Sequence, residues 1–260
     1  IWKLRRRSMD NIEKTLQELF DEMLTHVKGF RRKTYNGVFE KGYLKYRPVL
    51  VSLEQLLAET EDEEKDALIE KLSQVIPAYA YDKMQKEAKK NRERLGVDYN
   101  MNMAVYVIPF LNYSRNEDCE KLSRRIVEVW NEKKVTSLTL SHSSYDDIAE
   151  GFRSKLCYIT TAVCEHMQKE DDCYEMQVMR RFRDEYLMQT DEGRSIVEDY
   201  YEIAPGIVMI LNMQKDAAAI YKQLYCKYLL PCVQLIEQGK KAQCQALYMQ
   251  MVQNLKMQYI

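Results

Sequence analysis

The chain has 260 residues, of which 46% are hydrophobic and 30% charged, the balance of a globular protein that can bury a full core. Its formal net charge of -1 excludes a whole-protein electrostatic attraction to nucleic acid or to anionic membranes. No apolar run approaches the roughly eighteen residues of a membrane span. Only 8 Gly and 5 Pro occur, so we predict a mainly α-helical, multi-helix bundle rather than a turn-rich β architecture.

The seven cysteines are an odd number in a chain too large to need disulfide staples. We therefore expect reduced thiols in a cytoplasmic protein. The first residues carry a basic cluster without the apolar segment that a secretory signal requires, which fits the same localisation. Whether residues 1–8 are native stays open, because Met9 is an alternative initiator.

The first predicted helix covers 10–27, where apolar residues follow helical spacing, and it ends at Gly29. Residues 28–47 then combine seven basic side chains with one acid and five aromatic rings. Such a segment can bind phosphates and stack bases. It can equally be a connector whose rings pack inward while Lys and Arg stay solvated. Because no known nucleic-acid motif is present, we expect a connector and consider nucleic-acid binding unlikely.

Leucine spacing predicts a second helix over 48–58, and an acidic first turn marks a third helix after Thr60. After Pro77 a polar helix is expected to run to about Gly96. These helices belong to an N-terminal helical region that we place at 1–150.

Residues 100–112 (NMNMAVYVIPFLN) fit either a buried strand or the apolar part of a helix broken before Pro109. A β-prone run follows near 135–140. If both are strands, a minor two-stranded β element around 103–110 and 135–140 lies inside the helical fold. The segment 117–133 is a clear amphipathic helix, and Ser143 or Ser144 can cap a short helix after it.

The C-terminal helical domain is placed at 151–260. A helix over 206–230 closed by Pro231 is expected, followed by helices 232–237 and 240–259 joined at Gly239 as a helical hairpin. No Pro-, Ser- or Gly-rich linker separates the two regions, so we expect them to pack tightly together.

The stretch 157–211 is the most distinctive part of the chain. Its thiols and imidazole, Cys157, Cys164, His166 and Cys173, are candidates for cysteine catalysis, redox chemistry or metal binding. The spacings lack the Cys-x-x-Cys and His-x-x-x-His pairs of zinc sites, so we predict no metal and no cofactor. Cys157 follows the cations Arg153 and Lys155 and is the leading candidate for a reactive thiol.

A polar set follows these thiols. It forms either an anion site or an ion-pair network between helices, in which Arg183 could pair a carboxylate through two hydrogen bonds, and we favour the network. Its members are Arg181, Arg183, Asp184, Arg194, Tyr200 and Tyr201.

The motifs CYITTAVC, MRRFRDEYL and GRSIVEDYYEIAP, in this order, resemble the bacterial CFI-box domain, in its Clostridia-type form. The resemblance covers about fifty residues, one fifth of the chain, and Tyr158 stands where the name-giving pattern has Phe. Matching positions are Cys157, Tyr158, Ile159, Thr161, Ala162, Arg181, Phe182, Arg183, Asp184, Gly193, Arg194, Tyr200, Tyr201 and Pro205. The resemblance implies a bacterial domain and no established activity.

No Walker loop, dinucleotide-binding glycine pattern, kinase motif or Gly-x-Ser-x-Gly elbow occurs in the sequence. We therefore expect a non-enzymatic helical module that binds another protein, since Met and Tyr are plentiful at 14 and 19 and suit such surfaces. The first alternative is a thiol-dependent site centred on Cys157. The second is nucleic-acid binding through 28–47. The sequence does not specify the oligomeric state.

Overall fold

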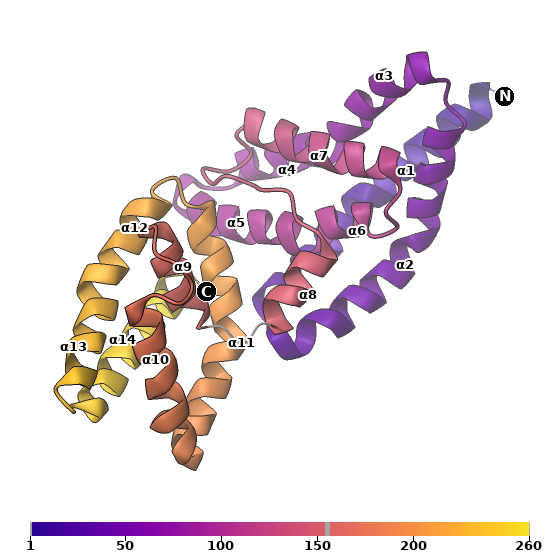
Figure 1. Ribbon diagram of the computed structural model, residues 1–260. Coiled ribbons are helices and arrows are strands. Elements are labelled where there is room, and N and C mark those ends of the chain that lie inside the picture. Colours follow the sequence, from indigo (N-terminus) through magenta and orange to yellow (C-terminus); the bar gives the residue numbers. More distant parts are fainter. Residues whose placement is uncertain (1, 154–156, 260) are drawn as a thin grey trace. The chain divides into compact units, whose positions relative to one another are not determined.

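The computed structural model describes residues 2–153 and 157–259, in which all regular secondary structure is helical (Figure 1). This confirms the predicted mainly α fold. The chain folds as two compact units: unit 1 comprises residues 1–29 and 34–150, and unit 2 comprises 30–33 and 151–260. Each unit is described below by itself.

Unit 1 contains eight of the α-helices found in the described residues. They are α1 Trp2–Leu24, α2 Arg32–Ala58, α3 Asp62–Ser73, α4 Val75–Lys86, α5 Lys89–Asn102, α6 Ile108–Asn112, α7 Glu117–Glu132 and α8 Tyr145–Arg153. Two of their boundaries follow the expected capping chemistry. The Asn116 side chain accepts a hydrogen bond from the Cys119 N–H at the start of α7, and the Ser144 Oγ accepts one from the Asp147 N–H at the start of α8.

Most of the basic and aromatic segment 28–47, expected to be a connector, is helical instead, since residues 32–47 form the first part of α2. Its rings Tyr35, Phe39 and Tyr46 recur at helical spacing and are all buried. Phe39 packs edge-to-face on Phe110, with ring centroids 4.6 Å apart. The inward packing of these rings was predicted correctly, and the same helical periodicity extends α2 through Pro48 rather than starting a helix there.

The predicted two-stranded β element is absent from the described residues. Residues 103–110 continue the helical path of α5 and α6, and all of them are buried. A fully buried helix lacks the polar face that would have separated it from a buried strand in the sequence. Residues 135–140 are irregular, and the Asn131 side chain bonds both the N–H and the carbonyl of Leu140, at 2.9 and 2.8 Å. The Asn131 side chain thus forms the hydrogen bonds that a neighbouring strand would otherwise form with Leu140.

Two prolines coincide with π-helical turns. Met103–Val107 is a π-helical turn directly before Ile108–Pro109, and Tyr225–Leu229 is one directly before Leu230–Pro231. Proline has no N–H and its ring clashes with the carbonyl four residues earlier, so the helix widens there. For Pro109 that carbonyl belongs to Val105, and the buried Tyr35 hydroxyl donates to it at 3.0 Å. Pro109 and Pro231 therefore distort their helices without ending them.

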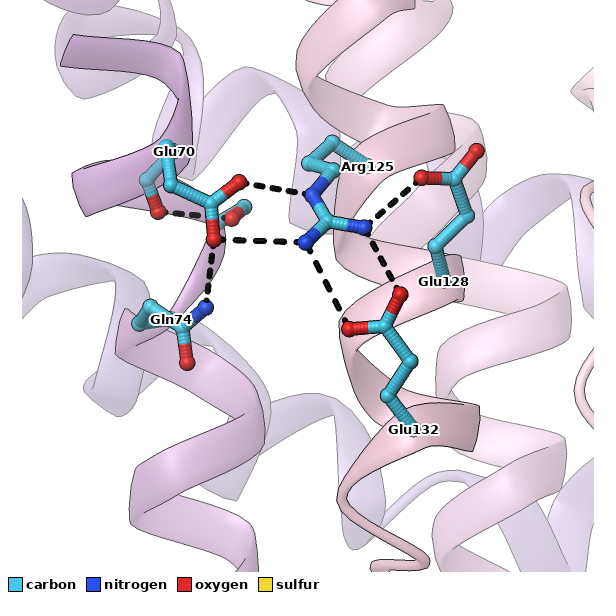
Figure 2. A network of polar contacts seen from close by, with 6 residues as sticks. Glu70, Gln74, Arg125, Glu128 and Glu132 are labelled. Carbon is cyan, nitrogen blue, oxygen red and sulfur yellow. Dashed lines mark hydrogen bonds and ion pairs between the residues drawn. The ribbon is translucent and has the colours of Figure 1, made fainter. Parts of the chain in front are cut away.

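A charged cluster connects α3 to α7 in unit 1 (Figure 2). The Arg125 guanidinium contacts Glu70 of α3 at 2.7 Å and Glu128 and Glu132 of its own helix at 2.9 Å each. Gln74 also donates to Glu70 at 2.9 Å. One cation is therefore shared by three carboxylates, and the hydrogen bonds that Arg125 donates to all three raise its pKa, those to Glu70 most.

Unit 2 contains α9 Tyr158–His166, α10 Tyr174–Glu185, α11 Asp191–Met213, α12 Ala217–Leu224, α13 Leu230–Glu237 and α14 Lys241–Tyr259 (Figure 1). Its core includes Ile159, Met176, Phe182, Ile207, Tyr221 and Cys232. The α13–α14 hairpin is confirmed. Gly239 has φ +72°, and the N–H groups of Gly239 and Lys240 return to the carbonyls of Ile236 and Leu235, which forms a Schellman motif.

The predicted single helix over 206–230 is wrong: α11 starts earlier, continues through Pro205 and ends at Met213, and α12 begins only at Ala217. The residue before α11, Thr190, caps its start, because the Thr190 hydroxyl accepts a hydrogen bond from the Gly193 N–H at 3.0 Å. Gly193 is packed against the preceding turn, and a Cβ placed there would lie 1.9 Å from the Leu187 carbonyl oxygen. Only glycine allows α11 to start so close to that turn.

Candidate functional site

A pocket of about 220 Å³ lies in unit 2 and is lined by α10, α11, α14 and the residue that precedes α9, Cys157. Its walls are mainly apolar and include Met179, Phe182, Leu187, Ile196, Val197 and Val252. The charged groups that line it are Arg183, Asp199 and Lys256. An apolar pocket with a few polar groups is the usual form of a binding site.

Arg183 of α10 is held in one position in this pocket by neighbouring groups. Its Nε and Nη2 atoms donate to the two Asp184 carboxylate oxygens at 2.7 and 3.0 Å, and its Nη1 donates to the Tyr201 hydroxyl at 2.9 Å. The hydrogen bonds from Arg183 lower the pKa of Asp184. The same Nη1 faces the Cys157 Sγ at 3.7 Å. Because its side chain is only 18% exposed, Arg183 presents a rigid cationic group.

Two adjacent tyrosines of α11 form hydrogen bonds with different helices. Whereas Tyr201 contacts Arg183, the Tyr200 hydroxyl accepts the Ile159 N–H at 2.9 Å. That N–H lies in the first turn of α9, where no partner exists within the helix. On α14, the Tyr248 hydroxyl lies 3.2 Å from the Thr160 Oγ1, beside the same turn. The start of α9 is thus capped by side chains from α11 and α14, which places Cys157 against α10.

The Cys157 thiol is 6% exposed. Burial raises its pKa, although the nearby Arg183 and Arg180 charges oppose that effect. A thiol that attacks as a thiolate needs the opposite shift. Lys155 lies outside the described residues, as does the side chain of Arg153, so the cations that the sequence suggested for Cys157 are replaced here by Arg183.

The remaining candidate thiols lie elsewhere in unit 2. Cys164 lies in the last turn of α9 and is 1% exposed, whereas Cys173, the residue before α10, is partly exposed. His166 is exposed, stacks on the Tyr221 ring with centroids 3.9 Å apart, and places its Nδ1 2.9 Å from the Ala162 carbonyl oxygen. The structure does not bring the four candidates into one group.

The polar set also divides. Arg183, Asp184 and Tyr201 are in contact, whereas Arg194 donates to the Met188 carbonyl at 2.8 Å and pairs with Asp191 at the start of α11. Arg181 is exposed on α10. In the described residues, no group of three or more His, Cys, Asp and Glu side chains has a metal-binding arrangement.

Five residues that line the pocket come from α14 and have no counterpart in the sequence-based candidates: Tyr248, Met249, Val252, Gln253 and Lys256. They lie far along the chain from Cys157, outside every motif that the sequence displays. Their i, i+4 spacing places Tyr248, Val252 and Lys256 on one face of α14, but this spacing alone does not indicate which helix they meet.

In comparisons with known proteins, no family model, no curated protein and no solved structure matches this chain. Across the described residues, no helix is both long and apolar enough to span a membrane.

Proposed function

We propose that unit 2 is a non-enzymatic protein-binding module whose Arg183 pocket takes up one large apolar side chain of a partner segment. The observation that carries this proposal is the small, mainly apolar pocket with a fixed cation. Pockets that enclose whole small ligands usually measure about 300 to 1,000 Å³. At about 220 Å³ this pocket is better matched to a single anchor side chain. Binding energy at protein interfaces is often concentrated in such anchors.

The charged side chains of the pocket favour a partner that carries an acidic group next to the anchor side chain. Of the two cations that line the pocket, Arg183 is paired with Asp184, whereas Lys256 has no ion-pair partner among the described residues. A carboxylate beside the anchor side chain would be attracted to Lys256 at the edge of an apolar pocket. The proposed partner is therefore a segment with a large apolar or aromatic residue next to an acidic group.

N-acetyl-tryptophan, which joins an indole to a carboxylate, is a direct probe of this pocket. We expect it to shift the NMR signals of α10, α11 and α14 at millimolar concentration. Because N-acetyl-tryptophan amide lacks the charge, we expect it to bind several-fold more weakly, and Lys256→Gln should reduce that difference. Equal affinity for N-acetyl-tryptophan and its amide would contradict the role of charge. NMR shifts spread over unit 1 would contradict binding at this pocket.

A pocket-filling variant provides the matched control. Val252→Phe adds a ring to a residue that lines the pocket, so it should abolish probe binding while the protein stays folded. Val208→Phe adds the same ring to another half-buried residue of the unit 2 cluster that does not line the pocket. We expect V208F to bind the probe like the original protein. Equal loss in both variants would show that the effect is not local.

The resemblance to the CFI-box domain remains part of this proposal. Cys157, Phe182, Arg183, Tyr200 and Tyr201, all positions of the resemblance, line the pocket together. A shared site would explain why these separated motifs occur in one stretch. Thiol chemistry at Cys157 has less support, because burial raises the pKa of that thiol.

A further inference from the structure

A second pocket lies in unit 1 and shares no residue with the Arg183 pocket of unit 2. It measures about 590 Å³ and is lined by the end of α6 and the residues after it, by α7, and by the first residues of α8 and the segment before it. Pockets that enclose small ligands usually measure about 300 to 1,000 Å³. This second pocket therefore has the size of a small-molecule site.

The uncharged polar part of the lining is fixed by hydrogen bonds. Asn112 is only 8% exposed, and its Nδ2 donates to the Ser143 carbonyl at 2.9 Å and lies 3.3 Å from the His142 Nε2. The Oγ of the fully buried Ser123 lies 2.9 Å from the same ring nitrogen. Burial lowers the pKa of His142, and the nearby Arg124 charge lowers it further. The imidazole is therefore neutral at pH 7 and adds no positive charge to the pocket.

The charges of the lining leave one carboxylate in excess. The charged residues are Arg115, Glu120, Arg124, Asp146 and Asp147. Arg115 pairs with Asp146 at 2.8 Å, and Arg124 pairs with Glu120 at 2.6 Å. Asp147 has no ion-pair partner among the described residues. Its hydrogen bonds at the start of α8 use the Oδ2 atom and leave Oδ1 without a partner in the described part of the chain. The pocket should therefore attract a cation.

Two aromatic rings form adjacent walls of the pocket. Tyr113 and Tyr145 both line it, with ring centroids 5.3 Å apart and ring planes at 85°. Packing holds each ring in place, since Tyr113 lies edge-to-face with Tyr43 at 4.7 Å and Tyr145 contacts Phe39 at 4.5 Å. Tyr113 is nevertheless 41% exposed, so part of its ring can meet a ligand. Aromatic ring faces attract cations, and quaternary ammonium groups are recognised in this way.

We propose that this pocket binds a small organic cation with a quaternary ammonium group, such as choline. The unpaired Asp147 carboxylate attracts the positive charge, and the two tyrosine rings contact the methyl groups. A metal ion is a poor match, because no group of three or more His, Cys, Asp and Glu side chains in the described ranges could hold one. A primary ammonium is also a poorer match, because it is strongly hydrated and would lose water on meeting the rings.

An NMR titration of the full chain with choline tests the proposal. We expect millimolar choline to shift the signals of residues 112–113, α7 and α8. The matched probe is 3,3-dimethyl-1-butanol, which has the shape of choline but carries carbon in place of the charged nitrogen. Because it lacks the charge, we expect it to bind roughly five-fold more weakly or worse.

Two variants locate the site, each with a control outside the lining. Tyr113→Leu removes one ring and should weaken choline binding roughly five-fold, whereas Tyr81→Leu, at a residue of α4 that is 37% exposed, should not. Asp147→Asn keeps an acceptor oxygen but removes the charge, so it should reduce the preference for choline over the alcohol. Asp66→Asn, at an exposed position of α3, should leave that preference unchanged. Thermal unfolding establishes that each variant is folded, and Y113L tests the site by itself if D147N is unstable.

Three results would overturn the proposal. Equal affinity for choline and the alcohol would show that charge is not recognised. Equal losses in Y113L and Y81L would show that the Tyr113 ring is not a wall of the site. Choline shifts confined to unit 2, or no shifts at millimolar choline, would show that this pocket does not bind the cation.

Discussion

Gly193 is the residue whose replacement the structure opposes most directly. A methyl group at this position would lie 1.9 Å from the Leu187 carbonyl oxygen, which is backbone and cannot rotate away. We expect Gly193→Ala to lower the free energy of unfolding by about 2 kcal/mol or more. Gly37→Ala is the control, because nothing lies within 4 Å of a Cβ there and the residue is in a helix. It should stabilise by up to about 1 kcal/mol in urea titrations. Equal changes in unfolding free energy for the two variants would contradict the close contact between Gly193 and the Leu187 carbonyl.

The Glu175 carboxylate should make the stability of the protein depend on pH in the acid range. Burial alone would raise its pKa, but hydrogen bonds from Lys169 and Tyr225 outweigh burial and lower the pKa to about 2. The stabilisation is therefore present above the ordinary pKa, 4.5, and is lost as the pH falls toward 2.

Glu175→Gln should cost on the order of 2 kcal/mol at pH 7 and much less near pH 2. Denaturant titrations at both pH values measure the difference. Glu185→Gln, at an exposed position of the same helix, is the control and should change little at either pH. A cost for E175Q that stays constant with pH would contradict the ionic role of this carboxylate.

At the scale of helices, the π-helical turn before Pro109 depends on one hydroxyl. Tyr35→Phe removes the hydrogen bond to the buried Val105 carbonyl, and Pro109, four residues later, has no N–H to replace the lost donor, so we expect a cost of about 1–2 kcal/mol. Tyr106→Phe is the matched control. Its hydroxyl is buried and has no hydrogen-bond partner among the described residues, so its removal should be neutral or stabilising. Thermal unfolding of the two variants compares them, and a larger loss for Y106F would contradict this assignment.

The contact between α3 and α7 should depend on salt. Arg125→Ala removes the cation that three carboxylates share, and we expect a cost of about 1 kcal/mol that decreases at high salt, where repulsion between the carboxylates is screened. Arg124→Ala removes one exposed pair with Glu120 on the same helix and should cost only a few tenths of a kcal/mol. Urea titrations at low and high salt separate the two, and equal costs would argue against a shared network.

At the scale of the whole molecule, the sequence predicts the helical class and several ends of helices, but not how distant helices meet. Local rules identified α7, the cap at Ser144 and the turn at Gly239, since each depends on nearby residues. Local rules failed at Pro109, Pro205 and Pro231, where packing outweighs the tendency of proline to end a helix. The ambiguity at 103–110 arose from complete burial.

The candidate site was partly predictable for the same reason. Arg183, Asp184 and Tyr201 were grouped from a motif pattern, and the structure brings these three together. Tyr248 and Lys256 depend on the return of α14 to α11, which no local spacing encodes. The different partners of Tyr200 and Tyr201 could not be predicted either. Adjacent residues of one helix point in different directions, but the helices that they meet are set by the fold.

The distribution of indole rings over the two units has a spectroscopic consequence. Both tryptophans of the chain, Trp2 and Trp130, belong to unit 1, and Trp130 is fully buried with its Nε1–H donating to Asn100 at 2.9 Å. Unit 2 contributes only tyrosine and phenylalanine to the aromatic spectrum. Fluorescence excited selectively at indole therefore originates in unit 1 alone, and a tryptophan introduced at Phe182 would give the Arg183 pocket an emission signal of its own.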